Sequence, residues 1–364
     1  MSDKHLSIGF VRRGYSATGG AEAYLQRLAR GVVDLGHDVR LITTPEWPAS
    51  AWPFGEITRL RAGSTTAFAD ELEELRPQIH CNLLMSLERV WRCDVYRAGD
   101  GVHRAWLERR QQFATPMQKL SRLFSRKHHG ILRLEKSLFA DGGAGRVIAN
   151  SQMVKKEIVD LYSYPANKID IVHNGVPIDR FRFDSARREN GRADLKLQGD
   201  EIALLFVGTG WERKGLRFAV DAIERCKNLK LRLLVAGRGN PRGYKSDCVQ
   251  FLGEVVDLVP IYAAVDIFIL PTIYDPFSNA CLEALASRLP VITTRSNGFS
   301  EIIENGVHGS IVDLANDEGL RRAILFWSDK ARRSSARSTI TERAAQFDIA
   351  KNVEQTLAIL MASG

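Results

Sequence analysis

Short apolar runs alternate along this chain with segments whose apolar residues recur at helical spacing. The runs are expected to be strands, and they occupy residues 6–11, 39–43, 79–84, 146–149, 202–207, 231–236, 249–252, 267–270, 291–294 and 310–312. Segments between them, such as 21–35 and 216–226, have the periodicity of amphipathic helices. This alternation is typical of parallel sheets covered by helices on both faces, so the chain is predicted to be α/β.

The alternation is interrupted between about residues 174 and 200. Residues 174–177 read Asn-Gly-Val-Pro, a turn, and residues 180–200 are charged and poor in large apolar side chains. The interruption predicts an interdomain linker at about 174–200. One doubly wound, Rossmann-like domain is then expected over residues 1–174 and a second over 175–346. A length of 364 residues is sufficient for two such domains.

Cysteine placement and hydropathy narrow the class of protein. The five cysteines are scattered and form no Cys-x-x-Cys pair, which argues against a disulfide framework and against a zinc site. No apolar run reaches the roughly eighteen residues that a transmembrane helix needs. The first strand follows Met1 within a few residues, so no secretory signal is expected. These features favour a cytoplasmic protein with reduced thiols.

The positive charge of the chain is concentrated in one segment. The net charge is +8, and residues 103–136 contain nine lysines and arginines against two glutamates. Met117, Leu120 and Phe124 share one helical face there, which indicates an interfacial helix on an anionic membrane or glycolipid. The alternative is an ordinary packed helix with solvated charges. Nucleic acid is disfavoured because no reader fold accompanies the patch. The predicted membrane and acceptor patch consists of Arg104, Arg109, Arg110, Lys119, Arg122, Arg126, Lys127 and Arg133.

Polar residues gather after the predicted strand at 267–270. Asp275 lies in the following loop, a helix is expected to begin at Asn279, and Glu283 lies one turn into that helix. A helix N-terminus suits a phosphate because its first amides are unpaired and carry partial positive charge. A carboxylate one turn further suits a ribose diol. The segment therefore predicts a site for a nucleotide diphosphate that carries a sugar.

A second motif follows the strand at 202–207. That strand ends at Gly208, and the sequence Arg213-Lys214-Gly215 is expected to open the next helix. Two cations there could neutralise a diphosphate leaving group. The alternative is a solvated first helical turn. A glycosidase pair of acids is disfavoured for Asp275 and Glu283, because a glycosidase has no use for a diphosphate pocket.

Two further features concern the first predicted domain. The pair Gly19-Gly20 follows the first strand, and missing side chains let a sugar or phosphate approach the backbone. A short strand is expected at 94–96, and Asp100 lies between two glycines after it, either as a simple turn residue or with its carboxylate against an acceptor hydroxyl. His103 either shares that role or is a surface histidine.

These motifs together resemble the retaining glycosyltransferases of family 4, which have the GT-B fold. The resemblance covers nearly the whole chain and rests on the acid-x7-acid pair of Asp275 and Glu283, the Gly-x4-Arg-Lys-Gly loop that starts at Gly208, and Gly19-Gly20. The first acid is usually glutamate in that family. Within it, the Asp100 turn, the chain length and the basic segment are most similar to glucosyltransferases of the lipopolysaccharide core.

The resemblance implies two Rossmann-like domains that face a deep cleft, with a C-terminal helix at about 347–364 crossing back to the first domain. It implies a nucleotide-sugar donor, UDP-glucose or similar, and no metal or other cofactor, which agrees with the absence of any Asp-x-Asp sequence. It places Asp275 on the donor sugar and Glu283 on the ribose. The implied catalytic residues are Asp100, Arg213, Lys214 and Asp275. The implied donor-binding residues are Gly19, Gly20, Gly208, Arg213, Lys214, Arg238, Val255, Asp275, Phe277, Ser278, Asn279, Ala280 and Glu283.

The resemblance further implies a hexose transfer to a membrane glycolipid or lipopolysaccharide-core acceptor, at the cytoplasmic face of the inner membrane. Two alternatives remain open at the level of sequence. One is a GT-B epimerase that acts on UDP-N-acetylglucosamine and needs no acceptor. The other is a protein that binds nucleotide sugars without turning them over.

Overall fold

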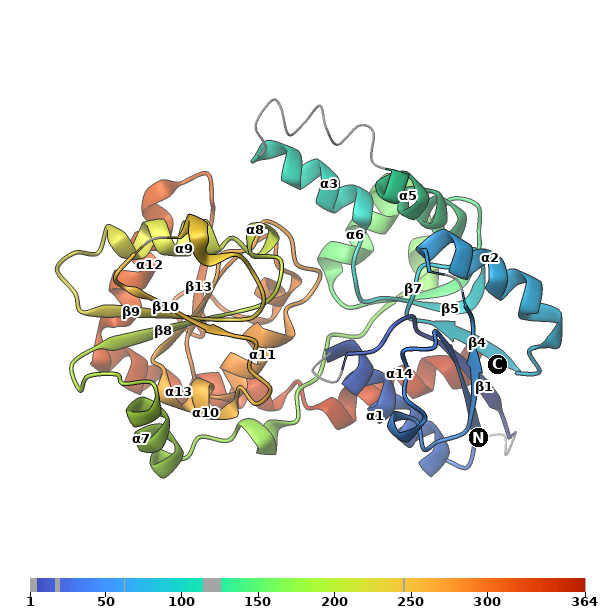
Figure 1. Cartoon of the computed structure of the whole chain (residues 1–364), viewed down its shortest axis with the longest axis horizontal. Coiled ribbons are helices and arrows are strands. Elements are labelled where there is room, and N and C mark those ends of the chain that lie inside the picture. The colour runs from blue at the N-terminus through green and yellow to red at the C-terminus, as the bar shows by residue number, and fades with distance from the viewer. Residues whose placement is uncertain (1–4, 17–19, 62, 114–125, 245, 364) are drawn as a thin grey trace. The chain divides into compact units, whose positions relative to one another are not determined.

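A computed structural model describes residues 5–16, 20–61, 63–113, 126–244 and 246–363 of the chain (Figure 1). It divides into two compact units. Unit 1 comprises residues 1–173 together with 351–364, and unit 2 comprises residues 174–350. The division falls within the turn where the sequence pattern breaks.

Unit 1 is built on a parallel sheet in which the strand order reverses direction between β1 and β4. The order is β3-β2-β1-β4-β5-β6-β7. The strands are β1 (Ser7–Val11), β2 (Asp38–Thr43), β3 (Glu56–Arg59), β4 (Leu83–Ser86), β5 (Cys93–Ala98), β6 (Ala144–Ala149) and β7 (Ile169–Ile171). The helices are α1 (Gly20–Asp34), α2 (Thr65–Leu75), α3 (His103–Gln112), α5 (Arg126–Phe139), α6 (Gln152–Tyr162) and α14 (Ile349–Ser363).

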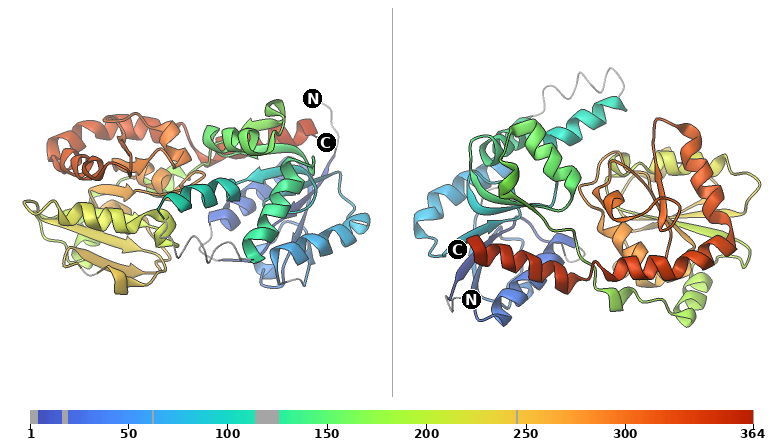
Figure 2. Two further views of the ribbon diagram at one scale, coloured as in Figure 1. Left: turned by 90° about the horizontal axis from the view of Figure 1, so that it is seen from above. Right: turned by 180° about the vertical axis from the view of Figure 1, so that it is seen from behind.

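The last helix, α14, packs against the first one, α1 (Figure 2). A side chain at Gly31 of α1 would lie 2.7 Å from Val353, so the missing side chain allows the close approach. The Tyr24 and Thr356 hydroxyls are 3.2 Å apart across the same contact. The end of the chain is thus part of the first unit.

Unit 2 has a second parallel sheet, in the order β10-β9-β8-β11-β12-β13. Its strands are β8 (Ile202–Val207), β9 (Leu231–Ala236), β10 (Val249–Gly253), β11 (Ile267–Leu270), β12 (Val291–Thr294) and β13 (Gly309–Val312). Its helices are α7 (Ser185–Asp194), α8 (Trp211–Lys214), α9 (Leu216–Glu224), α10 (Val259–Ala264), α11 (Asn279–Ala286), α12 (Asp317–Ser328) and α13 (Lys330–Ala345).

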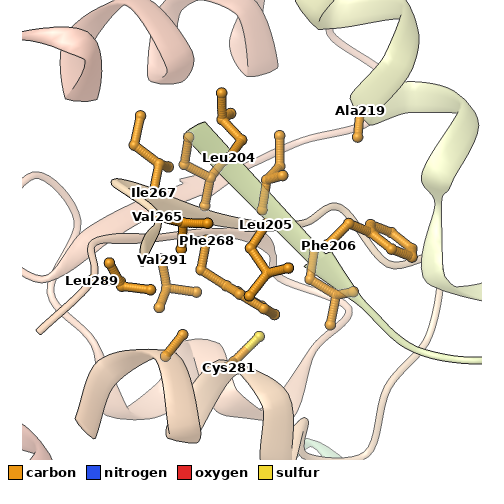
Figure 3. Close-up of a cluster of buried hydrophobic side chains, with 14 of the residues drawn as sticks. Leu204, Leu205, Phe206, Ala219, Val265, Ile267, Phe268, Cys281, Leu289 and Val291 are labelled. Atoms are coloured by element: carbon orange, nitrogen blue, oxygen red, sulfur yellow. The ribbon is translucent and has the colours of Figure 1, made fainter. Parts of the chain in front are cut away.

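The central strands of unit 2 are buried on both faces. The successive residues Leu204 and Leu205 of β8, together with Phe268 of β11 and Cys281 of α11, are completely inaccessible (Figure 3). Side chains that alternate to opposite faces are then all in apolar surroundings, which is why these strands appear in the sequence as unbroken apolar runs.

Three strand predictions need correction. The strand expected at 79–84 begins at Leu83, because residues 76–78 form a 3-10 turn. The strands β3 and β7 were missed. Both lie at the edges of the unit 1 sheet, and β3 has only partly buried or exposed residues, so neither produces a long apolar run.

The predicted linker is also wrong over much of its length. Residues 185–194 form α7, which packs on α10 so closely that Gly191 approaches the Pro260 carbonyl. Arg188 and Arg192 bind Asp266 through ion pairs of 2.6 and 3.3 Å. The helix is fixed to unit 2 by guanidinium contacts instead of apolar ones, and the segment therefore resembled a linker in composition.

Candidate functional site

The predicted donor motifs of unit 2 meet at the carboxyl edge of its sheet. The strand order reverses between β8 and β11, and the loops that follow these two strands carry the two motifs. Such a switch point is where open α/β sheets bind ligands. A side chain at Gly215 would lie 1.9 Å from the Pro271 carbonyl, and one at Gly237 would lie 2.3 Å from the Gly208 carbonyl. The glycines therefore let three loops pack backbone against backbone.

Arg213 and Lys214 do not open the long helix α9, as the sequence predicted. They form the last turn of the short helix α8, which ends at Gly215 with a φ of +77°. The reason is that a left-handed residue terminates one helix before the next begins. Cations in the last turn of a helix are favoured by its dipole, so the dipole of α8 does not by itself require an anion beside Arg213 and Lys214. The Arg213 guanidinium has no hydrogen-bond or ion-pair partner among the residues that the structure describes.

Lys214 and Asp275 form an ion pair that joins the two motifs. The Lys214 ammonium binds Asp275 Oδ2, and the two side chains are only 13% and 7% exposed. A charge so buried is costly without a partner. Asp275 is therefore a buried residue that is paired directly with the Arg-Lys motif.

A residue that the sequence analysis missed, Asn297, holds the Asp275 loop in place. Asn297 is completely buried, and its Oδ1 accepts hydrogen bonds from the amides of Ser278 (3.2 Å) and Phe299 (3.1 Å). Its Nδ2 donates to Thr293 Oγ1 at 2.9 Å. The Asn-Gly pair that follows β12 is a turn signal, but no local pattern indicates the long-range bond of Asn297 to Ser278.

The helix α11 begins as predicted, at Asn279. The Ser278 side chain caps it by accepting a hydrogen bond of 3.3 Å from the Cys281 amide. Asn279 is exposed, and its side chain accepts a bond of 2.7 Å from Asn174. The cap uses a later amide and leaves the first amides of the helix available to an anionic ligand.

Glu283 is held by a tyrosine one turn into α11. Tyr262 of α10 donates a hydrogen bond of 3.0 Å to Glu283 Oε2. Burial, together with the nearby Glu283 charge, raises the pKa of Tyr262 well above its ordinary value. The hydroxyl thus stays a neutral donor and orients the carboxylate, and Glu283 is not an isolated charge on a solvated face.

Two of the remaining predicted donor residues of unit 2, Arg238 and Val255, follow β9 and β10, and the other two, Phe277 and Ala280, lie around the start of α11. Arg238 is exposed and forms a 3.4 Å ion pair with Glu254. Val255 is half-buried, whereas its neighbour Val256 is 82% exposed. Phe277 and Ala280 flank Ser278, with Phe277 almost completely buried against Phe299.

In unit 1 the predicted Asp100 is 61% exposed and lies 4.0 Å from the Arg89 guanidinium. His103 is half-buried, and its Nε2 lies 2.9 Å from His128 Nδ1 while its ring packs on Trp106. Burial, reinforced by Arg89 and His128, lowers the pKa of His103 to about 3. A general base needs a pKa nearer to its working pH, so this environment argues against that role for His103. Gly20 begins α1, and Gly19 lies outside the described residues.

The carboxyl edge of the unit 1 sheet contains a cluster that the sequence analysis missed. Arg12, after β1, binds Glu88, after β4, at 2.8 Å and Glu22 of α1 at 3.2 Å. Burial raises the pKa of Glu88 despite the Arg12 charge. The cluster lies where the strand order of this sheet reverses, and its members are too far apart in sequence to form a motif.

The basic segment is only partly described. Lys119 and Arg122 lie outside the described residues, as do Met117, Leu120 and Phe124, and Arg126 begins α5. The other patch residues lie on α3 and α5. Two of them form ion pairs, Arg109 with Glu157 at 2.6 Å and Arg104 with Glu108 at 3.1 Å. Arg110 lies over the ring of Trp106 and Arg133 over the ring of Trp91. Lys127 is exposed. Over the described ranges, no helix is long and apolar enough to cross a membrane.

The buried Glu135 fixes these two basic helices to unit 1. Its carboxylate accepts hydrogen bonds from Arg89 Nε (3.0 Å), the Tyr162 hydroxyl (3.0 Å) and the Arg104 amide (3.1 Å). It also accepts one from the His103 amide and so caps the start of α3.

We therefore expect Glu135→Ala to lower the free energy of unfolding by about 3–5 kcal/mol, because it leaves the buried Arg89 charge without its partner. Urea denaturation measures this change. The matched control is Glu108→Ala on the exposed face of α3, where the lost surface pair costs about 0.5 kcal/mol or less. Equal losses in the two variants would contradict this account of Glu135.

Both halves of the chain match known protein families. Residues 18–180 match the model described as Glycosyltransferase Family 4, and residues 201–329 match the model described as Glycosyl transferases group 1. Within the residues that the structure describes, no group of three or more His, Cys, Asp or Glu side chains could hold a metal ion.

Curated relatives carry similar descriptions. An uncharacterised glycosyltransferase of Methanocaldococcus jannaschii is 28% identical over 59% of this chain and 60% of its own length. The lipopolysaccharide core biosynthesis glycosyltransferase LpsE of Rhizobium meliloti is 34% identical over 36% of this chain and 41% of its own. The chain thus spans about half the length of these relatives. A D-inositol 3-phosphate glycosyltransferase of Pseudarthrobacter chlorophenolicus is 26% identical over 82% of this chain and 80% of its own length.

Solved structures confirm the predicted fold of two Rossmann-like domains. WaaG, a glycosyltransferase involved in lipopolysaccharide biosynthesis, superposes with a TM-score of 0.80 and 20% identity over 97% of this chain and 99% of its own. HepE of Anabaena, solved in complex with UDP and glucose, superposes with a TM-score of 0.76 and 18% identity over 98% of this chain and 100% of its own.

Proposed function

We propose that this chain, a glycosyltransferase of the GT-B fold, moves a hexose from UDP-glucose or a similar donor to a hydroxyl of a lipopolysaccharide-core or other membrane glycolipid. The observation that carries the proposal is the buried Lys214–Asp275 pair beside the N-terminus of α11. It joins a cation, a carboxylate and a helix end at the switch point of a parallel sheet, which is the combination that a nucleotide diphosphate sugar requires.

The proposed roles follow from charge and position. When the bond between the sugar C1 and the β-phosphate oxygen breaks, negative charge builds on the leaving UDP. Lys214, Arg213 and the first amides of α11 stabilise that charge. Asp275 accepts hydrogen bonds from hydroxyls of the donor sugar. Glu283, oriented by Tyr262, accepts hydrogen bonds from the two ribose hydroxyls. The acceptor hydroxyl gives its proton to the leaving phosphate. Retention of anomeric configuration is proposed from the resemblance to family 4.

The acceptor side of the proposal rests on two similar enzymes and on the basic residues of unit 1. LpsE and WaaG, both similar to this chain, are described as enzymes of lipopolysaccharide biosynthesis. The basic residues of α3 and α5 suit an anionic membrane surface, so we propose a peripheral location on the cytoplasmic face of the inner membrane. Asp100, exposed beside Arg89, is proposed to contact the acceptor.

The donor is tested by thermal shift against UDP-, GDP- and ADP-glucose. A ligand that binds only the folded chain raises its melting temperature, and UDP-glucose is expected to give the largest shift. Hydrolysis or transfer is then followed with radiolabelled donor and a lipopolysaccharide-core acceptor. A new epimer formed without acceptor would support an epimerase instead, and UDP binding without turnover on any acceptor would support a non-enzymatic protein.

Metal removal gives a further prediction. Because side-chain cations and a helix end are proposed to take the place of a divalent ion, transfer in excess EDTA is expected to stay within about twofold of the rate with added Mg²⁺. The measurement is an initial-rate assay after exhaustive dialysis. A loss of activity that Mg²⁺ or Mn²⁺ restores would show that the metal-independent mechanism is wrong.

A further inference from the structure

Unit 2 has a second polar pocket at the edge of its sheet opposite to the donor motifs. The strands of this sheet are all parallel, and Asp266 and Pro290 directly precede β11 and β12, whereas the donor motifs follow β8 and β11. Phe183, before α7, and residues of α7, α10 and α13 complete the pocket. Among the described residues that line the pocket, Asp266 is the only acid. The four arginines that line it are Arg188, Arg288, Arg333 and Arg337.

The single carboxylate does not balance the arginines. Asp266 is already shared by Arg188 (2.6 Å) and Arg192 (3.3 Å), and Arg333 lies 3.9 Å away. Burial and the charges of Arg188 and Arg337 lower the pKa of Arg333, although Asp266 acts in the opposite sense. The pocket therefore concentrates positive charge that its own acid leaves uncompensated.

Two of the four guanidiniums have no anionic partner in the part of the chain that the structure describes. Arg288 and Arg337 each lie over the ring of Phe183, at 5.6 and 5.7 Å from its centroid. The aromatic ring holds both planar groups at the pocket without using their hydrogen-bond donors. Planar forks of this kind match the oxygens of a phosphate.

The backbone at Arg288 supplies a second observation. Arg288 has a φ of +64° and follows the end of α11, where the Leu289 amide bonds the Ala284 carbonyl (3.0 Å) and the Arg288 amide bonds the Leu285 carbonyl (3.0 Å). This is a Schellman motif, and its left-handed position favours glycine because a Cβ is strained there. Glycine would adopt this backbone conformation more easily, so Arg288→Gly removes the guanidinium without adding backbone strain.

We propose that this arginine pocket binds a phosphate group, separately from the donor site. The guanidiniums of Arg288 and Arg337 bind the phosphate oxygens, and Arg188 and Arg333 contribute the surrounding positive potential. The group belongs either to a free phosphate or to the phosphomonoester headgroup of a lipid.

The test is isothermal titration with inorganic phosphate, with ionic strength held constant by chloride. Arg288→Gly combined with Arg337→Gln removes both unpartnered guanidiniums, and glycine is compatible with the φ of position 288. The matched control is Lys196→Gly, because Lys196 occupies the same left-handed position after α7, with a φ of +56°, and does not line the pocket. Lys214→Ala reports any phosphate bound at the donor motifs.

The Kd for phosphate at the arginine pocket is expected to rise about tenfold or more in the double variant and to stay within about twofold of the unmodified chain in Lys196→Gly. Lys214→Ala is expected to remove only the phosphate bound at the donor motifs and to leave the binding at the arginine pocket in place. Sedimentation with phosphatidylcholine vesicles, with and without phosphatidic acid, separates the two sources. A parallel loss of phosphatidic acid binding in the double variant assigns the pocket to a headgroup, and unchanged vesicle binding assigns it to free phosphate. Phosphate binding that survives in the double variant, or that is absent from the unmodified chain, overturns the proposal.

Discussion

Lys214→Ala is expected to lower kcat for sugar transfer by about 10²–10³-fold while the chain stays folded. The proposed role of Lys214 is to neutralise charge that appears on the leaving diphosphate only as the sugar bond breaks. Loss of such a group reduces the rate by about this factor, since it acts on the transition state. The measurement is steady-state kinetics with UDP-glucose and acceptor.

The same substitution is also expected to lower stability, and this effect must be separated from the chemical one. It leaves the Asp275 carboxylate, 7% exposed, without its cation, at a cost of about 3–5 kcal/mol in the free energy of unfolding. Adding Asp275→Asn removes the unpaired charge and is expected to restore stability without restoring activity. Lys227→Ala changes an exposed lysine of the same unit and is expected to affect neither property. Normal turnover in Lys214→Ala, or activity regained in the double variant, would contradict the assignment.

Glu283→Gln is expected to raise the KM for UDP-glucose by about 10–100-fold. The carboxylate is proposed to accept hydrogen bonds from the ribose diol. Bonds to a charged group contribute about 1.5–3 kcal/mol, and each 1.4 kcal/mol corresponds to a factor of ten in affinity. The sharper measurement compares UDP-glucose with its 2′-deoxyribose analogue. The unmodified chain should discriminate against the analogue, and Glu283→Gln should not.

Tyr262→Phe is the matched control for Glu283. It removes the 3.0 Å bond that orients the carboxylate but keeps its charge, so we expect a smaller rise in KM, below about tenfold, and retained discrimination. Failure of the unmodified chain to distinguish the two donors would show that Glu283 does not contact the ribose.

Much of the fold could be predicted because the buried parallel strands are apolar without interruption. The strand at 202–207 and the strand at 267–270 were predicted with the bounds that the structure gives them. The edge strand β3 and the helix α7 were missed for the opposite reason. Their residues are held by pairing at a sheet edge or by arginine contacts, and neither interaction leaves an apolar pattern.

The sequence by itself determined which candidate catalytic and binding residues follow which strands, because strand ends and turn residues are local features of the chain. Lys214 and Asp275 were recognisable as separate motifs for this reason. Only the tertiary structure decided that they share a buried ion pair, that Asn297 fixes their loop and Tyr262 orients Glu283, and that four distant arginines line one pocket. Contacts between residues tens of positions apart depend on how strands are ordered in the sheet, and that order is set by the packing of the whole unit.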